Sequence, residues 1–500
     1  MKSHPRSSAH QEVELKLGLP GADPAALAKR LAHTPLLARR KWSQQSLYNI
    51  YFDTPDQLLR QQGAVLRLRR VGSEANPQWL QTLKTGASNA SALSRRGEWE
   101  TAVAGQALDL AALHGTHWSE MDRDGSLFES LVPNFVTRFE RTLWLVRRRD
   151  GSMVEVALDI GQIEAGAKLA PICELELELK AGLPSALFEI ARELARTVAV
   201  LPANLSKAQR GFLLAQDALY RPQRAQTPKL DSHLSKPELA QLLLREMFAQ
   251  FNQNLDALRT SDDPEVVHQA RIGWRRFKSG VRLFRKTLAP TEIPSWIELQ
   301  PLLSGLGEMR NLDVALTETL PSLSERYAEG DIERAQDWQT LIAALTQTAR
   351  QQRQAVRQAL QEPGVGMSLL ALAEWLENLS ALKLTRQGHK GNLREWARRQ
   401  VVRLHQRLEM AQQNAHTPQD QHRVRILAKR LRYGVEALRD LLPKRLANTC
   451  AEEALRLQSS LGLARDVSQA GVLVASNAPA PAIEAFLRGV AVGLNQSARE

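Results

Sequence analysis

Charged residues occupy every second position in several short segments of the N-terminal half of this sequence. The residues that alternate in this way are Glu12, Glu14 and Lys16; Arg67 and Arg69; Glu98 and Glu100; and Glu174, Glu176 and Glu178, followed by Lys180. In a β-strand, alternate side chains lie on the same face, so each segment would present one row of charge. Carboxylates bind hard divalent cations such as Mg²⁺, and Arg and Lys bind phosphate oxygens. Together the two kinds of row could bind a phosphoanhydride chain with its metal ion.

The opposite faces of the same segments are apolar, as at Leu15 and Leu17 or at Leu175 and Leu177. A sheet covered by helices on this apolar face would leave its charged face either open to water or curled around a polar lumen. Spacing alone leaves both interpretations open, because exposed charges on strands are common. In a closed sheet, like charges on neighbouring strands would repel one another unless a ligand held them together.

The pattern of apolar residues predicts the elements that must position these charges. Period-2 alternation predicts strands over residues 12–17, 64–70, 78–84, 98–103, 139–147, 154–160 and 172–179. Apolar residues at helical spacing predict helices over residues 24–32 and 184–198. A stretch rich in Pro, Gln, Arg and Ser around Pro222 and Pro228 predicts a linker. We therefore expect an α+β domain over residues 10–218, a linker over 219–236, and an all-α helical bundle over 237–500.

The helical half contains an internal repeat. His268, Arg271, Arg275 and Lys278 recur with the same spacing as His422, Arg425, Lys429 and Arg432. Each block is followed by a Leu-Gly-x-x-Arg motif, at 306–310 and at 461–465, which we interpret as a turn. Two related helical units packed about a pseudo-two-fold axis are therefore expected. Each block would form one basic stripe on a helix, which is either a solvated face or the wall of an anion-binding groove.

Composition and charge restrict the class of protein. The chain has 500 residues and a formal net charge of +12, which indicates an anionic partner such as nucleic acid, a phosphate polymer or a membrane surface. No apolar run is long enough for a membrane span, and the N-terminal residues are polar rather than signal-like. Cys173 and Cys450 are far apart in the sequence, which fits a reducing compartment. We expect a cytoplasmic protein that binds no membrane and no specific nucleic acid, since it has no P-loop, helix-turn-helix or zinc signature.

The charged segments of the N-terminal half resemble the CYTH family, the triphosphate tunnel metalloenzymes. The matching elements, in order, are Glu-x-Glu-x-Lys at 12–16, Tyr-Phe-Asp-Thr at 51–54, Leu-Arg-Leu-Arg at 66–69, Leu-Lys at 83–84, Arg-Gly-Glu-Trp-Glu at 96–100, residues 138–141 before Trp144, Asp159, Glu-Leu-Glu at 174–176, and Ser206 and Lys207 followed by Arg210. The resemblance covers most of residues 10–215. It implies an eight-stranded closed antiparallel barrel whose lumen binds triphosphate.

The same resemblance implies roles for the lumen residues. The phosphate-binding residues would be Lys16, Arg67, Arg69, Lys84, Arg96, Arg138, Arg141 and Lys207. The ligands of Mg²⁺ or Mn²⁺ would be Glu12, Glu14, Asp159, Glu174 and Glu176, with either Glu98 or Glu100 in addition. The candidate catalytic residues are Glu12, Glu14, Lys16, Glu174 and Glu176. Hydrolysis needs an oriented water and a stabilised leaving group, which carboxylates and cations facing each other across a lumen would supply.

The helical half resembles the CHAD domain in its two His-x-x-Arg-x-x-x-Arg/Lys blocks and its Leu-Gly-x-x-Arg motifs. The resemblance implies a basic channel for inorganic polyphosphate, bound by His268, Arg271, Arg275, Lys278, Arg282, His422, Arg425, Lys429 and Arg432. An acid follows the second motif at Asp466, whereas Asn311 follows the first, so the role of this acid stays open. The two histidines could instead bind a metal ion, although no cluster of metal-ligating residues surrounds either in the sequence.

We therefore expect metal-dependent hydrolysis of inorganic triphosphate in the barrel and polyphosphate binding by the helical half. Adenylate cyclisation of the class IV type and thiamine triphosphate hydrolysis would use the same lumen residues and remain alternatives. A non-catalytic polyphosphate-binding protein is a further alternative. The helical half offers basic side chains without an aromatic platform for bases, which favours substrates made only of phosphate.

Overall fold

The computed structural model describes residues 10–21, 23–72, 75–86, 91–379, 392–460 and 462–497. Contacts between residues group the chain into two compact units. The N-terminal unit comprises Met1–Pro222, Asn252–Ser261 and Leu360–Trp375, and the C-terminal unit comprises Gln223–Phe251, Asp262–Ala359 and Leu376–Glu500. Within the described ranges, none of the helices has both the length and the apolar character that a membrane crossing requires.

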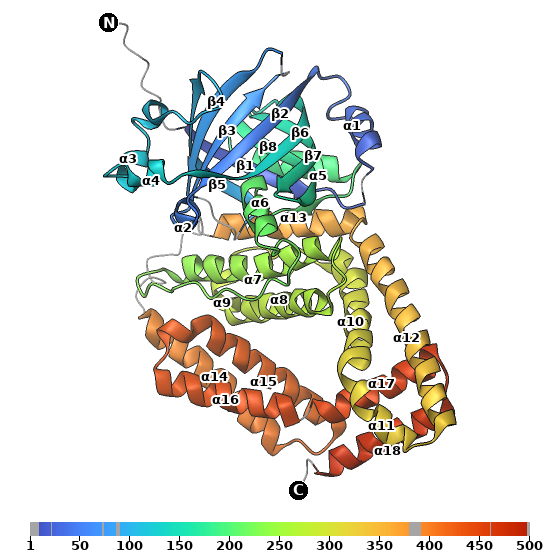
Figure 1. Ribbon diagram of the computed structural model, residues 1–500. Helices are drawn as coiled ribbons and strands as arrows, with labels where there is room; N and C mark the ends of the chain where they lie inside the picture. Colours follow the sequence, from blue (N-terminus) through green and yellow to red (C-terminus); the bar gives the residue numbers. More distant parts are fainter. Residues whose placement is uncertain are drawn as a thin grey trace, which may run out of the picture. The chain divides into compact units, whose positions relative to one another are not determined.

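Eight antiparallel strands form a closed barrel in the N-terminal unit (Figure 1). They are β1 (His10–Gly18), β2 (Trp42–Asp53), β3 (Ala64–Val71), β4 (Gln78–Thr85), β5 (Leu93–Val103), β6 (Val132–Arg147), β7 (Met153–Ala165) and β8 (Lys168–Ala181). Their order is β5-β4-β3-β2-β6-β7-β8-β1, and the pairing of β1 with β5 closes the ring. The short strand β9 (Leu201–Pro202) pairs with the end of β1. The expected closed eight-stranded barrel is therefore confirmed.

Seven of the eight barrel strands contain a segment predicted from period-2 alternation, and β2 is the one that does not. Residues 49–53 at the end of β2 are all buried, so both faces of this part of the strand are covered and neither is open to water. The predicted helix over 24–32 is α1 (Pro24–Ala32), with Asp23 as its N-cap. The predicted helix over 184–198 corresponds to α5 (Ser185–Ala195), which ends earlier than expected.

Apolar side chains cover the outer face of β2 to β5. Short helical segments supply them, namely α2 (Leu58–Gln61), the 3₁₀ turn η1 (Leu110–Leu113), α3 (Trp118–Met121) and α4 (Ser126–Glu129). Leu59, Leu113 and Trp118 from these segments pack with Leu66 and Leu68 of β3 in one buried cluster. Removing these large side chains from water stabilises the sheet with its charged face turned inward.

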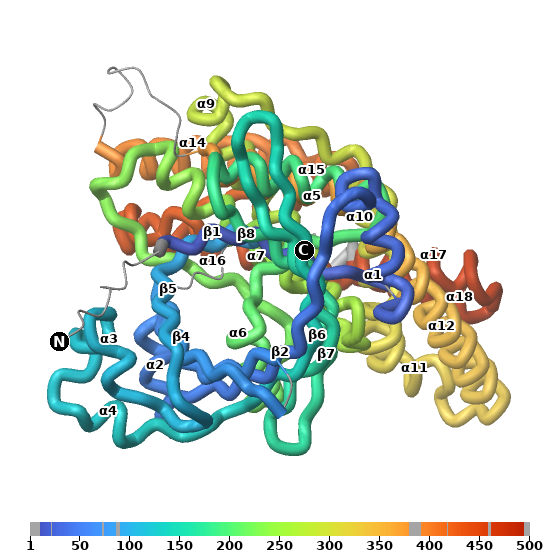
Figure 2. Tube along the Cα trace, turned by 90° about the horizontal axis from the view of Figure 1, so that it is seen from above, coloured from blue at the N-terminus to red at the C-terminus, as the bar shows by residue number. Residues whose placement is uncertain are grey.

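Helix α6 (Lys207–Ala215) packs against one end of the barrel, and Figure 2 shows the strands arranged around it. The helix begins in a capping box, in which Ser206 and Gln209 exchange side-chain and backbone hydrogen bonds. Gly211 allows the helix to approach β6 closely, because a Cβ at this position would lie 2.1 Å from the Phe135 ring. The cap and the close packing together fix the point at which Lys207 enters the barrel.

From Lys236 onward, the described residues are mainly helical. The elements are α7 (Lys236–Leu258), α8 (Pro264–Leu283), α9 (Arg285–Leu288), η2 (Ile297–Leu299), α10 (Gln300–Val314), the π-helical segment η3 (Ala315–Thr319), η4 (Pro321–Leu323), α11 (Ser324–Ala328), α12 (Ile332–Ala359), α13 (Pro363–Asn378), α14 (Leu393–Gln413), α15 (Pro418–Leu438), η7 (Arg439–Leu441), α16 (Lys444–Ser460), α17 (Leu463–Asn477) and α18 (Pro481–Ser497). In the C-terminal unit α15 packs between α14 and α16 (Figure 1).

The two repeats contact each other helix by helix. The first block of basic residues lies on α8 and the second on α15; α8 contacts α15, and α10 contacts α17. The motif at residues 306–310 lies inside α10, so the turn predicted there is wrong. Its glycine makes room for a neighbour instead, because a Cβ on Gly307 would lie 2.8 Å from a guanidinium nitrogen of Arg271. The second motif extends from the junction of α16 and α17 into the first turn of α17, which contains residues 463–465, and its Leu461 is outside the described residues.

Candidate active site

The barrel encloses a cavity of about 1130 Å³. The charged residues that line it are Glu12, Glu14, Lys16, Arg67, Arg69, Lys84, Arg96, Glu98, Glu100, Arg141, Glu155, Glu176, Glu178, Lys180 and Lys207. Ring closure turns the same face of each strand inward, so the rows of charge seen in the sequence meet in one space. The spacing in the sequence left open whether the charged face is exposed to water or lines a lumen. In the structure it lines a polar lumen.

One group of charges lies where β1, β4 and β5 meet. Lys84 Nζ lies 2.7 Å from a Glu12 carboxylate oxygen and 3.2 Å from Glu98. Arg96 and Lys16 both pair with Glu14. Burial alone would raise the pKa of Glu12, but Lys84 and Arg96 outweigh it and lower that pKa to about 2. Glu12 is therefore ionised throughout the physiological range.

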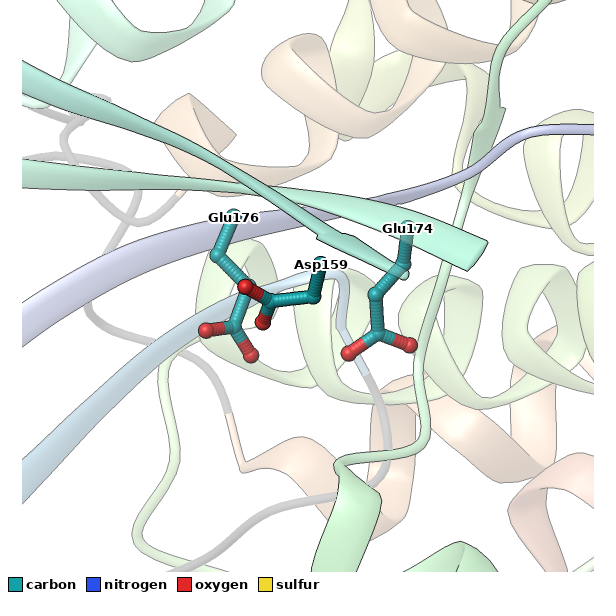
Figure 3. A group of neighbouring side chains, drawn as sticks. All are labelled: Asp159, Glu174 and Glu176. Carbon is teal, nitrogen blue, oxygen red and sulfur yellow. The ribbon is translucent and has the colours of Figure 1, made fainter. Parts of the chain in front are cut away.

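A second group lies on β7 and β8 and contains three carboxylates. Oxygen atoms of Asp159, Glu174 and Glu176 lie within 4.8 Å of one another. Figure 3 shows the three side chains on the same side of their two strands, with Asp159 between the two glutamates. Register explains this arrangement, because Asp159 is the direct cross-strand partner of Glu174 and Glu176 is two residues further along the same face. We refer to these residues as the carboxylate trio.

Cations from β6 and α6 neutralise the carboxylate trio. Lys207 Nζ lies 2.5 Å from Asp159, 2.5 Å from Glu174 and 3.0 Å from Glu176. Arg141 makes a bidentate pair with Asp159 at 2.7 and 2.6 Å. Burial would lower the pKa of Lys207, but the three carboxylates raise it above its ordinary value. Burial would likewise raise the pKa of Glu176, but Lys207, Arg141 and Lys16 hold it well below its ordinary value.

For Lys16, burial has a larger effect on the pKa than the neighbouring carboxylates have. Burial lowers the pKa of its ammonium group to about 8, because the favourable effects of Glu176 and Glu12 do not offset the lost hydration. An anion that enters the lumen beside Lys16 would therefore favour its protonated form. Lys16 is thus suited to gain an anion in the lumen as a partner in addition to Glu14.

Both candidate carboxylates on β5 line the cavity. Arg67 lies 3.5 Å from Glu98 and 3.7 Å from Glu100, and Glu98 also pairs with Lys84. Glu100 accepts a hydrogen bond of 2.9 Å from the Thr82 hydroxyl. The two residues face the same lumen because they are two positions apart on one strand.

Arg138 is the one predicted phosphate-binding residue that lies away from the lumen. It is on the outer face of β6, where it pairs with Glu164 at 3.1 Å and lies 4.2 Å over the Tyr48 ring. Arg138 and Arg141 are three residues apart in one strand, so they must face opposite sides of the sheet. The motif groups them together, but strand geometry separates them.

Asp53 and Arg210 belong to the motifs but were not among the predicted site residues. Asp53 is fully buried and accepts backbone N–H bonds from Thr54, Leu59 and Arg60 at 2.8 to 3.1 Å. It therefore stabilises the turn into α2 and is not a residue of the lumen. Arg210 pairs with Glu174 at 3.0 Å. Its position three residues after Lys207 on a helix was the available signal, since such residues share one face.

The donor set of the carboxylate trio fits a hard divalent cation. It offers only oxygen ligands, as Mg²⁺ and Mn²⁺ prefer, and neither His nor Cys is part of it. The same oxygens are paired with Lys207, Arg141 and Arg210. A metal ion held by the trio therefore has to replace cationic side chains, which can turn to an anion in the lumen.

The C-terminal unit holds a second cluster of charge, and it is cationic. Burial, followed by Arg275 and Arg425, lowers the pKa of Lys429 to about 7. Burial, followed by Arg275 and Arg310, lowers the pKa of Arg271 to about 10. Residues of both repeats thus share one electrostatic environment, with Arg310 of α10 added to the predicted stripes.

The predicted residues of the stripes do not all lie equally deep. Burial, followed by Arg310, lowers the pKa of His268, whereas His422 in the second repeat is exposed. Lys278 lies near Arg282, which is exposed at the end of α8. Arg432 pairs with Glu436 at 3.3 Å. The cluster therefore includes His268 beside the arginines and Lys429, whereas His422 is exposed.

Comparison with known proteins gives two family matches and a curated relative. The family model described as CYTH domain matches residues 10–212, and the one described as CHAD domain matches residues 242–475. A Haemophilus influenzae protein named inorganic triphosphatase is 35% identical over 207 residues, which are 41% of this chain and 55% of that protein. The chain thus covers about half the length of this relative.

Two solved structures are similar to parts of the chain. The CHAD domain from the plant Ricinus communis is 27% identical, with a TM-score of 0.47, over 55% of this chain and 92% of that one. A Hippeastrum protein described as having a dominant triphosphatase activity is 18% identical, with a TM-score of 0.30, over 41% of this chain and 95% of that one. With TM-scores this low, neither likeness is evidence for the chemistry of this chain.

Replacing one carboxylate of the trio should weaken metal binding. Glu176→Gln removes a charged ligand while it keeps the side-chain shape, so we expect Mn²⁺ affinity, measured by electron paramagnetic resonance of the free ion, to fall roughly 10–100-fold. Glu164→Gln on the neighbouring strand β7 is the matched control, because Glu164 pairs with Arg138 on the outer face. Unchanged Mn²⁺ affinity in Glu176→Gln, with both variants folded, would show that the trio binds no metal.

Proposed function

We propose that the barrel of this chain hydrolyses inorganic triphosphate to pyrophosphate and phosphate with Mg²⁺ or Mn²⁺, on the premise that residues 10–212 match the CYTH domain and residues 242–475 match the CHAD domain. The closed lumen, in which rows of carboxylates face rows of Lys and Arg, carries this proposal. The curated relative named inorganic triphosphatase supports it.

The cationic residues would hold the triphosphate and its leaving group. Lys16, Arg67, Arg69, Lys84, Arg96 and Arg141 come from five different strands and line the same cavity as Lys207 of α6. Fixed cations of this kind stabilise charge that develops on phosphate oxygens, because they need little reorganisation when the reaction occurs. Arg138 is left out of this set, since it lies on the outer face.

The carboxylates would hold the metal ion and the attacking water. A bound Mg²⁺ or Mn²⁺ ion would neutralise phosphate oxygens and help to activate water. The low pKa values of Glu12 and Glu176 suit these residues to bind cations and make them weak proton acceptors. A glutamate of the 12/14 pair or of the 174/176 pair would orient the attacking water and accept its proton. The water oxygen bonds to a terminal phosphorus while the bridging P–O bond breaks, and pyrophosphate leaves.

The alternatives on the same barrel differ in their products. Adenylate cyclisation would give cyclic AMP from ATP, and thiamine triphosphate hydrolysis would need contacts to an organic group. The residues that line the cavity are mostly charged, and the apolar ones include Leu47, Tyr51, Val65 and Leu143. A substrate made only of phosphate uses the charged majority, which favours inorganic triphosphate.

Product analysis tests the proposed reaction. The purified protein is incubated with inorganic triphosphate, ATP or long-chain polyphosphate, with and without Mg²⁺ or Mn²⁺, and every product is identified. We expect metal-dependent release of phosphate and pyrophosphate from triphosphate, and a rate roughly 10²–10³-fold lower in Glu14→Gln. Cyclic AMP from ATP, or binding of triphosphate without turnover, would contradict the proposal. Glu164→Gln again serves as the control that keeps its rate.

We further propose that the C-terminal unit binds inorganic polyphosphate through the cationic cluster on α8, α10 and α15, to which Arg465 of α17 adds its charge beside Arg425 and Lys429. The lowered pKa values of Arg271, Arg425 and Lys429 support this, because burial is their first cause and the charge of Arg275 contributes to each, so positive charge is concentrated in one place. A polymer of closely spaced negative charges would relieve this repulsion. Gly307 supports it too, since its missing side chain lets Arg271 lie against α10.

Polyphosphate affinity should depend on pH through Lys429. In the free protein Lys429 loses its proton above pH about 7, whereas bound polyphosphate favours the protonated form. Affinity should therefore fall on the order of ten-fold between pH 7 and pH 9 at constant ionic strength, measured by titration calorimetry. Lys429→Arg stays charged over this range, so its affinity should fall much less. If the polyphosphate affinity fell equally in the parent protein and in Lys429→Arg, Lys429 would not be part of the binding site.

A further inference from the structure

Arg69 differs from the other cations of the lumen in having no acidic partner. Lys16, Arg67, Lys84, Arg96, Arg141, Lys180 and Lys207 each form at least one ion pair with a carboxylate. Within the described part of the chain, no carboxylate lies at ion-pair distance from Arg69. Burial, then Arg67 and Arg141, lower the pKa of Arg69 to about 10, and Glu100, which is beyond ion-pair distance, offsets them only in part. The positive charge of Arg69 is thus directed at the cavity without being neutralised.

A neutral amide holds the guanidinium in place. Arg69 Nε donates a hydrogen bond of 2.8 Å to Oδ1 of Asn49. Nδ2 of Asn49 donates a bond of 2.9 Å to the Thr137 hydroxyl. Asn49 and Thr137 are both fully buried. Because a guanidinium can only donate, the oxygen of the Asn49 amide must face Arg69, and Thr137 then fixes that orientation by accepting from the nitrogen.

Strand register places the three side chains in one row. Asn49 on β2 is the direct partner of Arg69 on β3 and of Thr137 on β6. The three residues therefore share the inner face of neighbouring strands, where direct partners have their Cβ atoms about 4.5–5.5 Å apart. The next row along the barrel contains Tyr51, whose ring stacks on Phe135 at 4.5 Å and closes that side of the row. The row is thus built into the sheet and does not depend on a loop.

We propose that Asn49, oriented by Thr137, is a positioning residue that presents the unneutralised guanidinium of Arg69 to the anionic substrate. This inference rests on the proposed function of the lumen as a triphosphate site. An amide suits the task because it accepts one N–H bond without cancelling the charge, whereas a carboxylate at residue 49 would pair with Arg69 and compete with the substrate. The other lumen cations have to leave a carboxylate before they reach an anion, and Arg69 does not.

Isosteric variants separate this role from a structural one. Asn49→Asp keeps the size of the side chain and an acceptor for Arg69 but adds a negative charge, so we expect Kd and KM for triphosphate to rise roughly ten-fold or more. Thr137→Val removes the acceptor that orients the amide, and it should raise both constants several-fold. Thr137→Ser keeps the hydroxyl, and it should restore the parental values. Thermal denaturation of each variant reports whether it is folded.

A double-variant comparison decides whether Asn49 acts through Arg69. If it does, Asn49→Asp should weaken triphosphate binding much less in an Arg69→Ala background than in the parent. Binding is measured by calorimetry with inorganic triphosphate and no added metal, beside turnover with Mg²⁺. If the parent protein bound triphosphate but did not hydrolyse it, the proposed reaction would be contradicted. The affinities of the variants would still test the role of Asn49. The positioning role would be overturned if Asn49→Asp bound triphosphate as tightly as the parent protein, or if it lowered the affinity equally in the parent and in Arg69→Ala. It would also be overturned if the parent protein did not bind triphosphate.

Discussion

The pairing of opposite charges inside a closed barrel is the interaction on which the rest of the N-terminal unit depends. Charged groups that turn into a lumen lose much of their hydration, and each would be costly there alone. The closure of β1 on β5 brings Arg96 to Glu14, and the packing of α6 brings Lys207 to the carboxylate trio. Loss of one partner from such a buried pair costs about 3–5 kcal/mol. The charges of the lumen are therefore stable only as a set.

The same pairing determines how ligands can enter. Under the proposed function, a metal ion would reach the carboxylate trio only when Lys207 and Arg141 turn to another anion, and triphosphate would reach these cations only when the carboxylates gain another cation. Metal ion and triphosphate satisfy both needs at once, because each takes over one half of the existing ion pairs. Arg69 is the exception, since it can bind phosphate without leaving a carboxylate.

Much of this arrangement follows from sequence, and what does not has identifiable causes. Alternating charges and apolar residues predict strands such as β1, β3 and β8 and the face that carries their charge. They do not predict β2, whose end is buried on both faces, and this strand carries Asn49. Arg138 was grouped with Arg141 by motif, although three residues along a strand reverse the face. Strand closure and cross-strand register are properties of the whole sheet, so no single segment contains them.

The helical half shows the same limit. The repeat of spacing predicts two related basic helices, and α8 and α15 carry them in contact with each other. The spacing does not reveal that Gly307 lies inside a helix and makes room for Arg271, because that contact joins residues distant in sequence. Nor does it show that Arg310 joins the cluster. In both units the sequence identifies the charged residues, but it does not show which residues they contact.

The central claim is that metal ion and triphosphate exchange partners with the existing ion pairs, and thermal denaturation of the whole chain tests it directly. The melting temperature of the protein is measured without ligand, with Mg²⁺, with inorganic triphosphate, and with both ligands at the same concentrations. The scan is fast enough that the protein hydrolyses no significant amount of triphosphate. Ligands that favour each other's binding stabilise the protein together by more than the sum of their separate effects. The account predicts such a surplus, and its loss in Glu176→Gln. Additive shifts in the parent protein would contradict it.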